Sequence, residues 1–383
     1  MAKIVLIGNT ASSLLNFRKE LIIKLISLEN KVYCLVSDFD AETKLLVKDL
    51  GAVPIDSPLN SKGVNPVSDI KSTIKLSLIL KRIQPDIVFS YFVKPVIFGS
   101  SAAKLAKVPR IIGMIEGLGN AFTPKSTDGF DTKTKVIQCI QVLLYKRSLP
   151  LLDTLIVLNP DDKKDLIDKF NINVKNTVVL GGIGVDLNKF KYNPVPPNQP
   201  VTFIFIARLL KEKGVYEYLQ ASAEVKRKFP DTKFYILGGF EEQNPFSLKR
   251  AELDDYLLSD IVNYPGHVDN VSDYLTGSSV FVLPSFYREG VPRSIQEAMA
   301  IGRPIITTDV PGCRETVSDG VNGFLIPPFN SDILAKKMME LIENPSLINK
   351  MGRESRQIAE LKFDINKVND RLIALLIPDN LKG

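Results

Sequence analysis

The sequence is poor in the residues that build metal centres and disulfide frameworks. It has one histidine, His267, and three cysteines that lie far apart, Cys34, Cys139 and Cys313. An odd number of widely spaced cysteines argues against disulfides and a zinc site, and it favours a reducing cytoplasm. No run of 18 or more apolar residues occurs, so we expect no transmembrane helix. The opening MAKIVLIGNT predicts a β-strand rather than a signal peptide.

No dinucleotide-binding fingerprint follows that first strand. A nicotinamide-dependent oxidoreductase on an α/β fold needs G-x-G-x-x-G there, whereas residues 8–13 read GNTASS. Asp38 and Asp40 have the D-x-D spacing of some metal sites. They lie between a predicted strand and a predicted helix, where a turn and an N-cap are favoured. We therefore expect neither a cofactor nor a metal requirement.

Acidic residues are too few in the first half to balance its lysines and arginines. Residues 1–190 carry 26 Lys and Arg against 18 Asp and Glu, a net charge of +8, while residues 191–383 carry 23 against 25, a net charge of −2. A basic half attracts anionic lipid head groups or a phosphorylated substrate, although a solvated lysine-rich surface explains the same counts.

One basic segment is a candidate for contact with a membrane. The helix expected at 69–83 carries the cationic residues Lys71, Lys75, Lys81 and Arg82. A basic amphipathic helix of this kind can lie at a membrane surface. An ordinary packed helix with a charged outer face has the same pattern.

Short apolar strands alternate with amphipathic helices, and the alternation occurs twice. A chain of 383 residues is long enough for two domains. In the first half we expect strands at 3–8, 31–37, 85–91, 108–116 and 153–159, with helices at 17–29, 42–51 and 69–83. In the second half we expect strands at 201–207, 232–239, 279–285, 304–309 and 323–328, with helices at 214–229 and 332–344 and one that begins near Pro292. This pattern predicts two parallel sheets, each covered by helices on both faces.

A proline-rich segment separates the two halves. Residues 191–200 read KYNPVPPNQP, which predicts a linker because proline fixes φ and lacks an N–H. We therefore predict an N-terminal domain at 1–190 and a C-terminal domain at 201–362. A final helix within 363–383 is expected to pack back onto the N-terminal domain. Ligands of open α/β sheets bind beyond the carboxyl ends of the strands, so a cleft between the domains is expected.

The segment REGVPRSIQEAMAIGRP, residues 288–304, carries two glutamates. Glu289 follows an apolar strand, in a position where loops carry function. Glu297 is explained by ligand binding or, with Ser294, by the S-x-x-E pattern of a capping box. Carboxylates accept paired hydrogen bonds from sugar diols. Backbone N–H groups near the expected helix start can face an anion.

Two further loops follow strands of the second half. Arg208 and Lys213 in ARLLKEKG suit a diphosphate, although an ordinary basic loop has the same composition. The loop YPGHV contains Gly266, His267 and Val268, and we expect its backbone to contact a base.

Taken in order, these motifs resemble one family. R-x(4)-K, PSFYREGVPRSIQEAMAIGRP, TDVPGCRE and DGVNGFLIPP are similar to the donor domain of family-4 retaining glycosyltransferases of the GT-B fold. That fold has two Rossmann-like doubly wound α/β domains that face each other across a cleft. The resemblance implies that Glu289 contacts the donor sugar, that Glu297 holds the nucleotide ribose, and that Arg208 and Lys213 bind the diphosphate. It also implies that the backbone of residues 290–292 (Gly290, Val291 and Pro292) lies near the donor.

The first half is similar to the capsule and O-antigen subgroup of that family. The matching segments are SLLNFRKELI, GVNPVSDI, PDIVFSYFVKPVIFG and VPRIIGMIEGLGNAF. The resemblance implies a UDP-sugar donor and an acceptor sugar on undecaprenyl diphosphate. It implies a cytoplasmic enzyme, peripheral at the inner face of the membrane, that binds no nucleic acid. We favour an N-acetylhexosamine as the donor sugar.

The match to the family is incomplete at one position. Many members have a histidine where this chain has Ile115 and Glu116. Glu116, beside Gly117, is a candidate contact for a substrate hydroxyl, although a glutamate at a strand end can instead bind backbone amides. Lys94 is a candidate for the acceptor phosphate. Gly8 and Asn9 are candidates for backbone contacts to the donor diphosphate.

The expected mechanism is front-face attack in which the departing diphosphate helps to remove the acceptor proton, and Arg208 and Lys213 stabilise the leaving charge. Two alternatives remain open from the sequence. One is a GDP-sugar-dependent enzyme of the same fold, and the other is a non-catalytic protein that binds nucleotide sugars.

Overall fold

The structure is a computed structural model. It describes the chain except residues 61–65, 127–128, 196–199, 242–243, 245–246 and 378–383. The described chain forms two compact units. The first contains Met1–Ala121, Lys135–Ile183 and Ile365–Gly383, and the second contains Phe122–Thr134 and Gly184–Asp364.

The first unit is built on a parallel sheet of seven strands. Their order is β3-β2-β1-β4-β5-β6-β7. The strands are β1 (Lys3–Ile7), β2 (Lys31–Val36), β3 (Val53–Asp56), β4 (Ile87–Tyr91), β5 (Arg110–Ile115), β6 (Thr154–Val157) and β7 (Thr177–Val179). At the centre, Ile4 pairs with Val32 on one side and with Ile87 on the other. Since the central strands are apolar along their length, both faces of this sheet need covering by helices.

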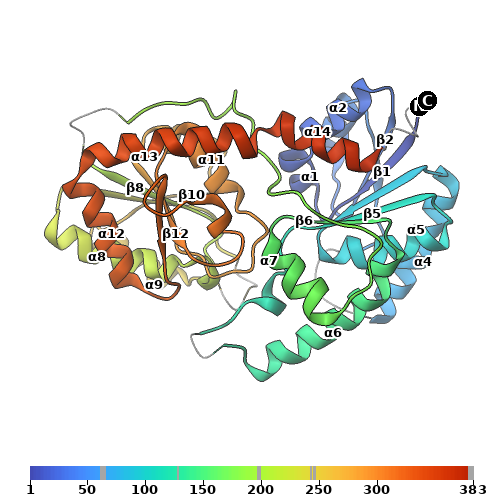
Figure 1. Cartoon of the computed structure of the whole chain (residues 1–383), viewed down its shortest axis with the longest axis horizontal. Coiled ribbons are helices and arrows are strands. Elements are labelled where there is room, and N and C mark those ends of the chain that lie inside the picture. Colours follow the sequence, from blue (N-terminus) through green and yellow to red (C-terminus); the bar gives the residue numbers. More distant parts are fainter. Residues whose placement is uncertain (61–65, 127–128, 196–199, 242–243, 245–246, 378–383) are drawn as a thin grey trace. The chain divides into compact units, whose positions relative to one another are not determined.

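Helices cover both faces of the first sheet, with α1, α2 and α14 on one side and α4 and α5 on the other (Figure 1). The helices of this unit are α1 (Ala11–Phe17), α2 (Lys19–Ser27), α3 (Ala41–Asp49), α4 (Pro66–Ile83), α5 (Ser100–Leu105), α6 (Thr132–Ser148), α7 (Pro160–Asp162) and α14 (Ile365–Leu376), with π-helical turns η1 (Pro95–Gly99) and η4 (Lys163–Asp168). An ion pair of 2.6 Å joins Lys24 of α2 to Asp370 of α14. The last helix therefore packs on the sheet formed by the first half of the chain.

The second unit has a parallel sheet of six strands in the order β10-β9-β8-β11-β12-β13. The strands are β8 (Thr202–Ile206), β9 (Lys233–Leu237), β10 (Asn263–Gly266), β11 (Val280–Leu283), β12 (Ile305–Thr308) and β13 (Gly323–Ile326). The helices are α8 (Val215–Lys228), α9 (Arg250–Leu258), α10 (Val271–Thr276), α11 (Arg293–Ile301), α12 (Ser331–Glu343) and α13 (Pro345–Ile358), with a π-helical turn η7 (Ala359–Phe363). Figure 1 draws α11 and α13 on one face of this sheet and α8 and α12 on the other.

Each sheet has one point at which the strand order reverses. It lies between β1 and β4 in the first sheet and between β8 and β11 in the second. Loops that leave neighbouring strands at such a point diverge, and ligands of this fold class bind there. The loop after β8 carries Arg208 and Lys213. The loop after β11 carries Glu289 and leads into α11, which carries Glu297. The expected pair of doubly wound parallel sheets is confirmed.

Several local predictions need correction. The helix expected at 17–29 is present as α2, but the sequence missed the short α1 that precedes it and is separated from it by Arg18. YPGHV was expected to be a loop, but its first residues belong to β10. The sequence also missed the edge strands β3 and β7, which are short and only partly buried.

The expected linker is held against the second unit in the part that the structure describes. The Asn193 N–H donates to the Ile301 carbonyl at 2.9 Å, and the Val195 N–H donates to the Asn349 side chain at 3.0 Å. The prolines and asparagine of 196–199 lie outside the described residues. The unit boundaries also differ from the sequence-based ones, because residues 122–134 belong to the second unit.

Candidate active site

Two loops at the carboxyl edge of the second sheet are tied together by their backbones. The Glu212 carbonyl, in the loop after β8, accepts hydrogen bonds from the N–H groups of Phe286 at 2.9 Å and Tyr287 at 3.0 Å, in the loop after β11. Gly214 permits this approach. Its φ is +77°, and a Cβ there would lie 2.1 Å from the Pro284 carbonyl oxygen. A side chain at residue 214 would therefore separate the two loops.

Lys213 and Glu289 meet where these loops join. The Lys213 Nζ lies 2.7 Å from the Glu289 Oε1, and the two side chains are only 10% and 14% exposed. The Ser285 hydroxyl lies 3.0 Å from the same carboxylate oxygen. The Lys213 ammonium also lies 5.0 Å from the centre of the Tyr287 ring. The structure thus brings a predicted diphosphate contact and a predicted sugar contact together.

Arg208 lies near this pair but has a different partner. Its guanidinium binds the Glu241 carboxylate at 2.7 Å, and half of its side chain is exposed. Partial burial acts to lower the pKa of Arg208, but Glu241, Tyr287 and Glu289 outweigh it, so the pKa is raised. The Glu289 carboxylate is one of the charges that raise the pKa of Arg208, so Arg208 lies within electrostatic range of the Lys213–Glu289 pair. Arg208 therefore remains cationic beside that pair.

Glu297 does not take part in the expected capping box. The N-cap of α11 is Pro292, and no side chain caps this end of the helix, so Ser294 does not play the predicted part. Glu297 instead binds Arg293 at 3.1 Å, one helical turn away. Burial raises the pKa of Glu297, and Arg293 opposes the shift. The carboxylate is therefore held in a partly desolvated position one turn into the helix. Gly302 ends α11 with a φ of +92°.

Gln296 is a site residue that the sequence did not reveal. It is fully buried. Its amide nitrogen donates to the Val291 carbonyl at 3.1 Å, and its amide oxygen accepts from the Gly184 N–H at 3.1 Å. It therefore ties the Gly-Val-Pro turn, residues 290–292, to the backbone of Gly184. No spacing signal distinguishes it from the other polar residues of α11.

The same turn is approached by a second glycine. Gly312, in the DVPGCRE segment, has a φ of +85°. A Cβ there would lie 2.5 Å from the Gly290 carbonyl oxygen and 2.6 Å from that of Glu289. The backbone of the loop that contains Glu289 thus packs directly on residue 312. Burial raises the pKa of the neighbouring Cys313 thiol to about 12, so this cysteine is a packing residue.

Gly266 ends β10 at the carboxyl edge of the second sheet, and His267 and Val268 follow it. The Gly266 carbonyl accepts from the Gly238 N–H at 2.9 Å, and the Tyr264 hydroxyl donates to the Gly238 carbonyl at 2.8 Å. Gly266 has a φ of +88° with open space where a Cβ would stand, and His267 is exposed. The segment presents backbone to the solvent, as a contact to a base requires.

In the first unit, Gly8 and Asn9 follow β1 at the point where the strand order reverses. A Cβ on Gly8 would lie 2.3 Å from the Tyr91 hydroxyl, so only glycine fits beside this ring. The Asn9 carbonyl accepts from the Ser37 hydroxyl at 3.0 Å. The Tyr91 hydroxyl is buried with no hydrogen-bond partner within the part of the chain that the structure describes, and burial raises its pKa.

Glu116 forms an ion pair with Arg18, a residue that the sequence did not single out. Both side chains are at least nine-tenths buried, and the Arg18 guanidinium lies 4.8 Å from the centre of the Tyr91 ring. Gly117 follows with a φ of +109°, which lets the chain turn away from β5. At the position where the family resemblance implies a histidine, this chain has a buried arginine–glutamate pair beside a tyrosine.

Lys94 is held by its own unit. Its ammonium binds Asp69 of α4 at 2.9 Å and the Asn60 carbonyl at 2.9 Å. Asp69 is buried, so part of the Lys94 charge serves to neutralise it. An acceptor phosphate near Lys94 would therefore compete with Asp69.

Asp38 and Asp40 have capping roles, as expected. Asp38 accepts from the Ala11 N–H at 2.7 Å, at the start of α1. Asp40 is the N-cap of α3 and forms a capping box with Thr43. Within the described residues, no group of three or more His, Cys, Asp and Glu side chains is placed to hold a metal ion.

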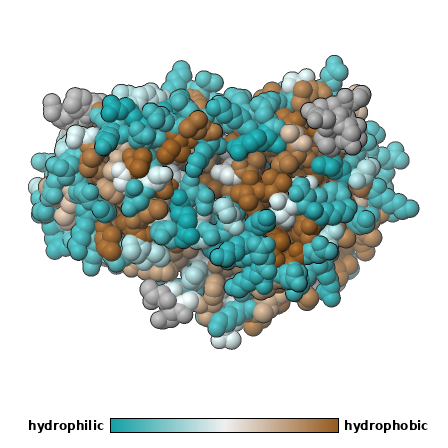
Figure 2. Space-filling model, in the orientation of Figure 1, coloured by the Kyte–Doolittle hydropathy of each residue, from teal (hydrophilic) through white to brown (hydrophobic). Residues whose placement is uncertain are grey.

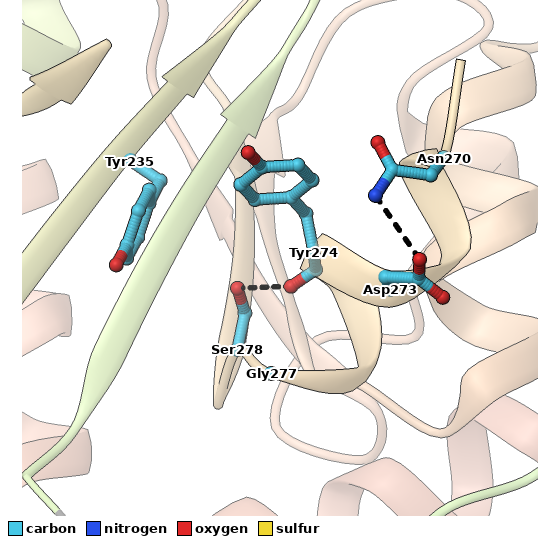
Figure 3. Close-up of a pocket in the computed structure, with 6 residues that line it drawn as sticks. All are labelled: Tyr235, Asn270, Asp273, Tyr274, Gly277 and Ser278. Carbon is cyan, nitrogen blue, oxygen red and sulfur yellow. Dashed lines mark hydrogen bonds between the residues drawn. The ribbon is translucent and has the colours of Figure 1, made fainter. Parts of the chain in front are cut away.

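A hollow of about 230 Å³ elsewhere in the second unit contains none of these residues. Figure 3 shows Tyr235 of β9 and Tyr274 of α10 beside it, with Asn270 hydrogen-bonded to Asp273 at 3.0 Å. The two rings lie 6.1 Å apart in an edge-to-face arrangement. Since none of the motif residues lines this hollow, we do not assign it to the donor.

Two family descriptions match the chain. "Glycosyl transferase 4-like" matches residues 3–156, and "Glycosyl transferases group 1" matches residues 188–358. The N,N'-diacetylbacillosaminyl-diphospho-undecaprenol alpha-1,3-N-acetylgalactosaminyltransferase of Campylobacter jejuni is 28% identical over 97% of this chain and 98% of its own. The UDP-Gal:alpha-D-GlcNAc-diphosphoundecaprenol alpha-1,3-galactosyltransferase of Escherichia coli is 28% identical over 84% of this chain and 82% of its own.

Solved structures support the same fold. HepE of Anabaena, in complex with UDP and glucose, has a TM-score of 0.77 with 17% identity over 98% of this chain and 99% of its own. The family descriptions cover both halves of the chain, and the structural likeness extends over nearly its whole length. The chain belongs to the glycosyltransferases of the GT-B fold, with a glycosyl transferase 4-like N-terminal half and a group 1 C-terminal half.

Proposed function

We propose that this enzyme transfers a hexose or N-acetylhexosamine from a UDP-sugar to a saccharide on undecaprenyl diphosphate, with retention at the anomeric carbon, during synthesis of a bacterial surface polysaccharide. The names of the Campylobacter and Escherichia relatives support the acceptor class. The contact between Lys213 and Glu289, with Arg208 beside them, is the observation that carries the donor site.

The donor is held by charge and hydrogen bonding from the second unit. Lys213 and Arg208 neutralise the diphosphate, and Glu289 accepts hydrogen bonds from sugar hydroxyls. Glu297 accepts from the ribose diol, and the backbone of residues 266–268 contacts the base. We infer UDP over GDP from the relatives, because a site made of backbone groups carries little side-chain discrimination. A GDP-sugar donor is the alternative that the experiment below separates.

The proposed reaction is a front-face displacement. The bond between the anomeric carbon and the diphosphate oxygen breaks while the acceptor oxygen bonds to the same carbon. The acceptor proton passes to the departing diphosphate. Arg208 and Lys213 stabilise the charge that develops on the leaving group, which is the largest contribution an enzyme makes to such a step. Since the two cations neutralise that negative charge without a metal ion, we expect transfer to proceed in EDTA.

On the acceptor side, we propose that Glu116 and Lys94 face the lipid-linked saccharide. Glu116 is oriented by Arg18. Lys94 lies at the rim of a groove of about 160 Å³ lined largely by apolar side chains of η1 and α6. An apolar groove beside a cation suits the first isoprene units and the diphosphate of the acceptor. The groove residues are Val93, Lys94, Ile97, Phe98, Ile137, Ile140, Gln141 and Leu144.

We also propose that the first unit binds the membrane surface, chiefly through α6. This helix contains no acidic residue and carries cations at both ends. Its exposed apolar side chains are those of Val136, Ile137, Ile140 and Leu143. Single exposed apolar residues are common on soluble proteins. Figure 2 shows hydrophobic residues (brown) among hydrophilic ones (teal) on the face that it draws. A run of them flanked only by cations is typical of an interfacial helix. None of the helices in the described part of the chain meets the criteria for a membrane span.

The test is a donor screen with purified protein and one defined undecaprenyl-diphosphate saccharide. Radiolabelled UDP-hexoses, UDP-N-acetylhexosamines and GDP-hexoses are supplied separately, with and without EDTA. We expect a UDP-sugar to yield a lipid-linked product with an α-linkage. Product from GDP-sugars alone would replace the donor assignment. Nucleotide-sugar binding without product from any donor, across several lipid-linked acceptors, would support a non-catalytic binding protein.

A further inference from the structure

A segment that follows β5 in sequence packs on both loops of the donor site. Residues 122–134 belong to the second unit, although the chain on either side of them belongs to the first. Thr123 is fully buried, and its hydroxyl accepts a hydrogen bond from the Arg288 N–H at 3.0 Å. The Lys125 Nζ lies 3.1 Å from the Glu212 Oε1. One residue of the segment therefore contacts the loop of Glu289, and another contacts the loop of Lys213.

Glu212 is a buried carboxylate with few polar partners to offset its charge. Its side chain is 3% exposed. Among the residues that the structure describes, its Oε2 has no hydrogen-bond partner, while Oε1 is bound by Lys125. A buried charge is tolerated when it is paired, and removing the partner is strongly destabilising. Lys125 is therefore the ion-pair partner that offsets the buried charge of Glu212 at this position.

The backbone of Glu212 is the point at which the two donor loops join. Its carbonyl accepts from the N–H groups of Phe286 and Tyr287. It also lies 3.2 Å from the Ser285 hydroxyl, which is 3.0 Å from the Glu289 carboxylate. A displacement of Glu212 would thus shift both Lys213, its neighbour in sequence, and Glu289. Errors of about 1 Å in such positions reduce activity by about a hundredfold.

We propose that Lys125 is a positioning residue of the donor site. By neutralising Glu212 it holds the loops of Lys213 and Glu289 in the arrangement that receives the nucleotide diphosphate. Lys125 need not touch the substrate. This inference rests on the proposed nucleotide-sugar donor, and it assigns part of the donor site to a segment that lies within the N-terminal half of the sequence.

The test measures UDP and GDP affinity by calorimetry, and donor and acceptor KM in the transfer assay. In Lys125→Met we expect affinity for the nucleotide that the wild type binds to fall about tenfold or more, with donor KM rising and acceptor KM unchanged. Lys125→Arg keeps the charge and should stay within about threefold of the wild type. The double variant Lys125→Met/Glu212→Gln removes both charges and should recover most of the loss. Lys228→Met is the matched control, because its ion pair with Glu343 is exposed.

The outcomes separate this inference from the proposed function. Wild-type protein that binds neither UDP nor GDP would overturn the proposed donor, and the inference with it. Wild-type binding that Lys125→Met retains in full would overturn the inference alone. If Lys125→Met does not fold, the double variant decides. A double variant that folds and binds the nucleotide supports the ion pair. A double variant that folds and binds no better than Lys125→Met contradicts it.

Discussion

Lys213 and Glu289 bind each other at 2.7 Å, and this bears on how the proposed donor is held. A carboxylate that pairs with an ammonium through one oxygen can still accept hydrogen bonds from other donors. In the complex that we propose, the diphosphate of the donor brings negative charge to Lys213, while the sugar hydroxyls bring hydrogen-bond donors to Glu289. The bound substrate therefore replaces part of the ion pair on each side and leaves no charge unpaired.

Replacing either residue should reduce transfer strongly. We expect Glu289→Ala and Lys213→Ala to lower kcat by about 10²–10³, because each removes a stabiliser of charge or orientation in the transition state. Initial rates with a labelled donor measure the change, and circular dichroism checks the fold. Turnover close to the wild-type value in either purified variant would contradict the role assigned to that residue.

Glu297 offers a test through pH. Burial raises its pKa in the folded state above the value of about 4.3 for an unfolded glutamate. Its contribution to stability is thus complete below that pH and is lost as pH rises through the folded pKa. We expect the melting temperature of the wild type to fall relative to that of Glu297→Gln as pH rises from about 4 to 7. A difference that does not vary with pH would contradict the shift.

At the scale of elements, close backbone contacts set the donor loops. Gly214 lets the loop after β8 approach Pro284, and Gly312 lets the chain after β12 approach Glu289 and Gly290. A glycine at such a contact has two roles, since it supplies a positive φ and leaves room for a neighbouring carbonyl. These roles can be separated, because Gly320 has a similar φ of +72° with open space around it.

Gly312→Ala should therefore be worse than Gly320→Ala. Both variants carry the strain of a non-glycine residue at positive φ, about 1 kcal/mol. Only Gly312→Ala also forces a Cβ against two carbonyl oxygens of the donor loop. We expect it to lose further stability and at least about tenfold in transfer, since a small displacement of Glu289 is costly. Urea denaturation and initial rates measure the two effects, and equal behaviour of the two variants would contradict the packing argument.

The helix α6 is the element through which we propose that the first unit binds the membrane surface. Replacing Ile140 by Glu removes an apolar side chain and adds a charge of the wrong sign. Transfer of one isoleucine from water is worth about 1.5–3 kcal/mol. We expect Ile140→Glu to weaken binding to vesicles with anionic lipid by about tenfold or more in a sedimentation assay. Ile74→Glu, on the exposed face of α4, tests the helix that the sequence analysis named as a candidate. A greater loss in Ile74→Glu than in Ile140→Glu would reverse the assignment.

At the scale of the whole molecule, charge is divided unevenly along the chain. Residues 1–190 carry a net +8 and residues 191–383 a net −2. The basic part coincides largely with the unit that contains α6 and the proposed acceptor groove. Attraction between basic residues and an anionic bilayer is worth about 1 kcal/mol per residue near the surface and is screened by salt.

Binding to vesicles should accordingly respond to both salt and lipid charge. We expect affinity for vesicles with anionic lipid to fall as salt rises from about 0.05 to 0.5 M, because the Debye length shortens. Neutral vesicles should bind weakly at every salt concentration. Sedimentation of the wild-type protein measures both series, and binding that is equal for the two kinds of vesicle would show that charge does not drive the association.

Patterns local in the sequence predicted much of the fold and part of the site. Apolar strands such as β1 and β11 are recognisable because both faces of a parallel strand are buried. The donor loops were found because their residues follow such strands at fixed spacings. The edge strands β3 and β7 were missed because short, half-exposed strands lack that signal. The capping box that the sequence left open as an alternative for Glu297 is absent, because α11 begins at Pro292 without a side-chain cap and Glu297 pairs with Arg293.

The sequence by itself determined that this chain folds as two parallel α/β units and that Arg208, Lys213, Glu289 and Glu297 lie in loops and helix starts at strand ends. Only the tertiary structure decided which groups meet: Lys213 with Glu289, Arg18 with Glu116, and Lys125 with Glu212. The physical reason is that strand and helix periodicity is written in neighbouring residues, whereas ion pairs between residues as far apart as 18 and 116 depend on how the chain returns to the same sheet edge.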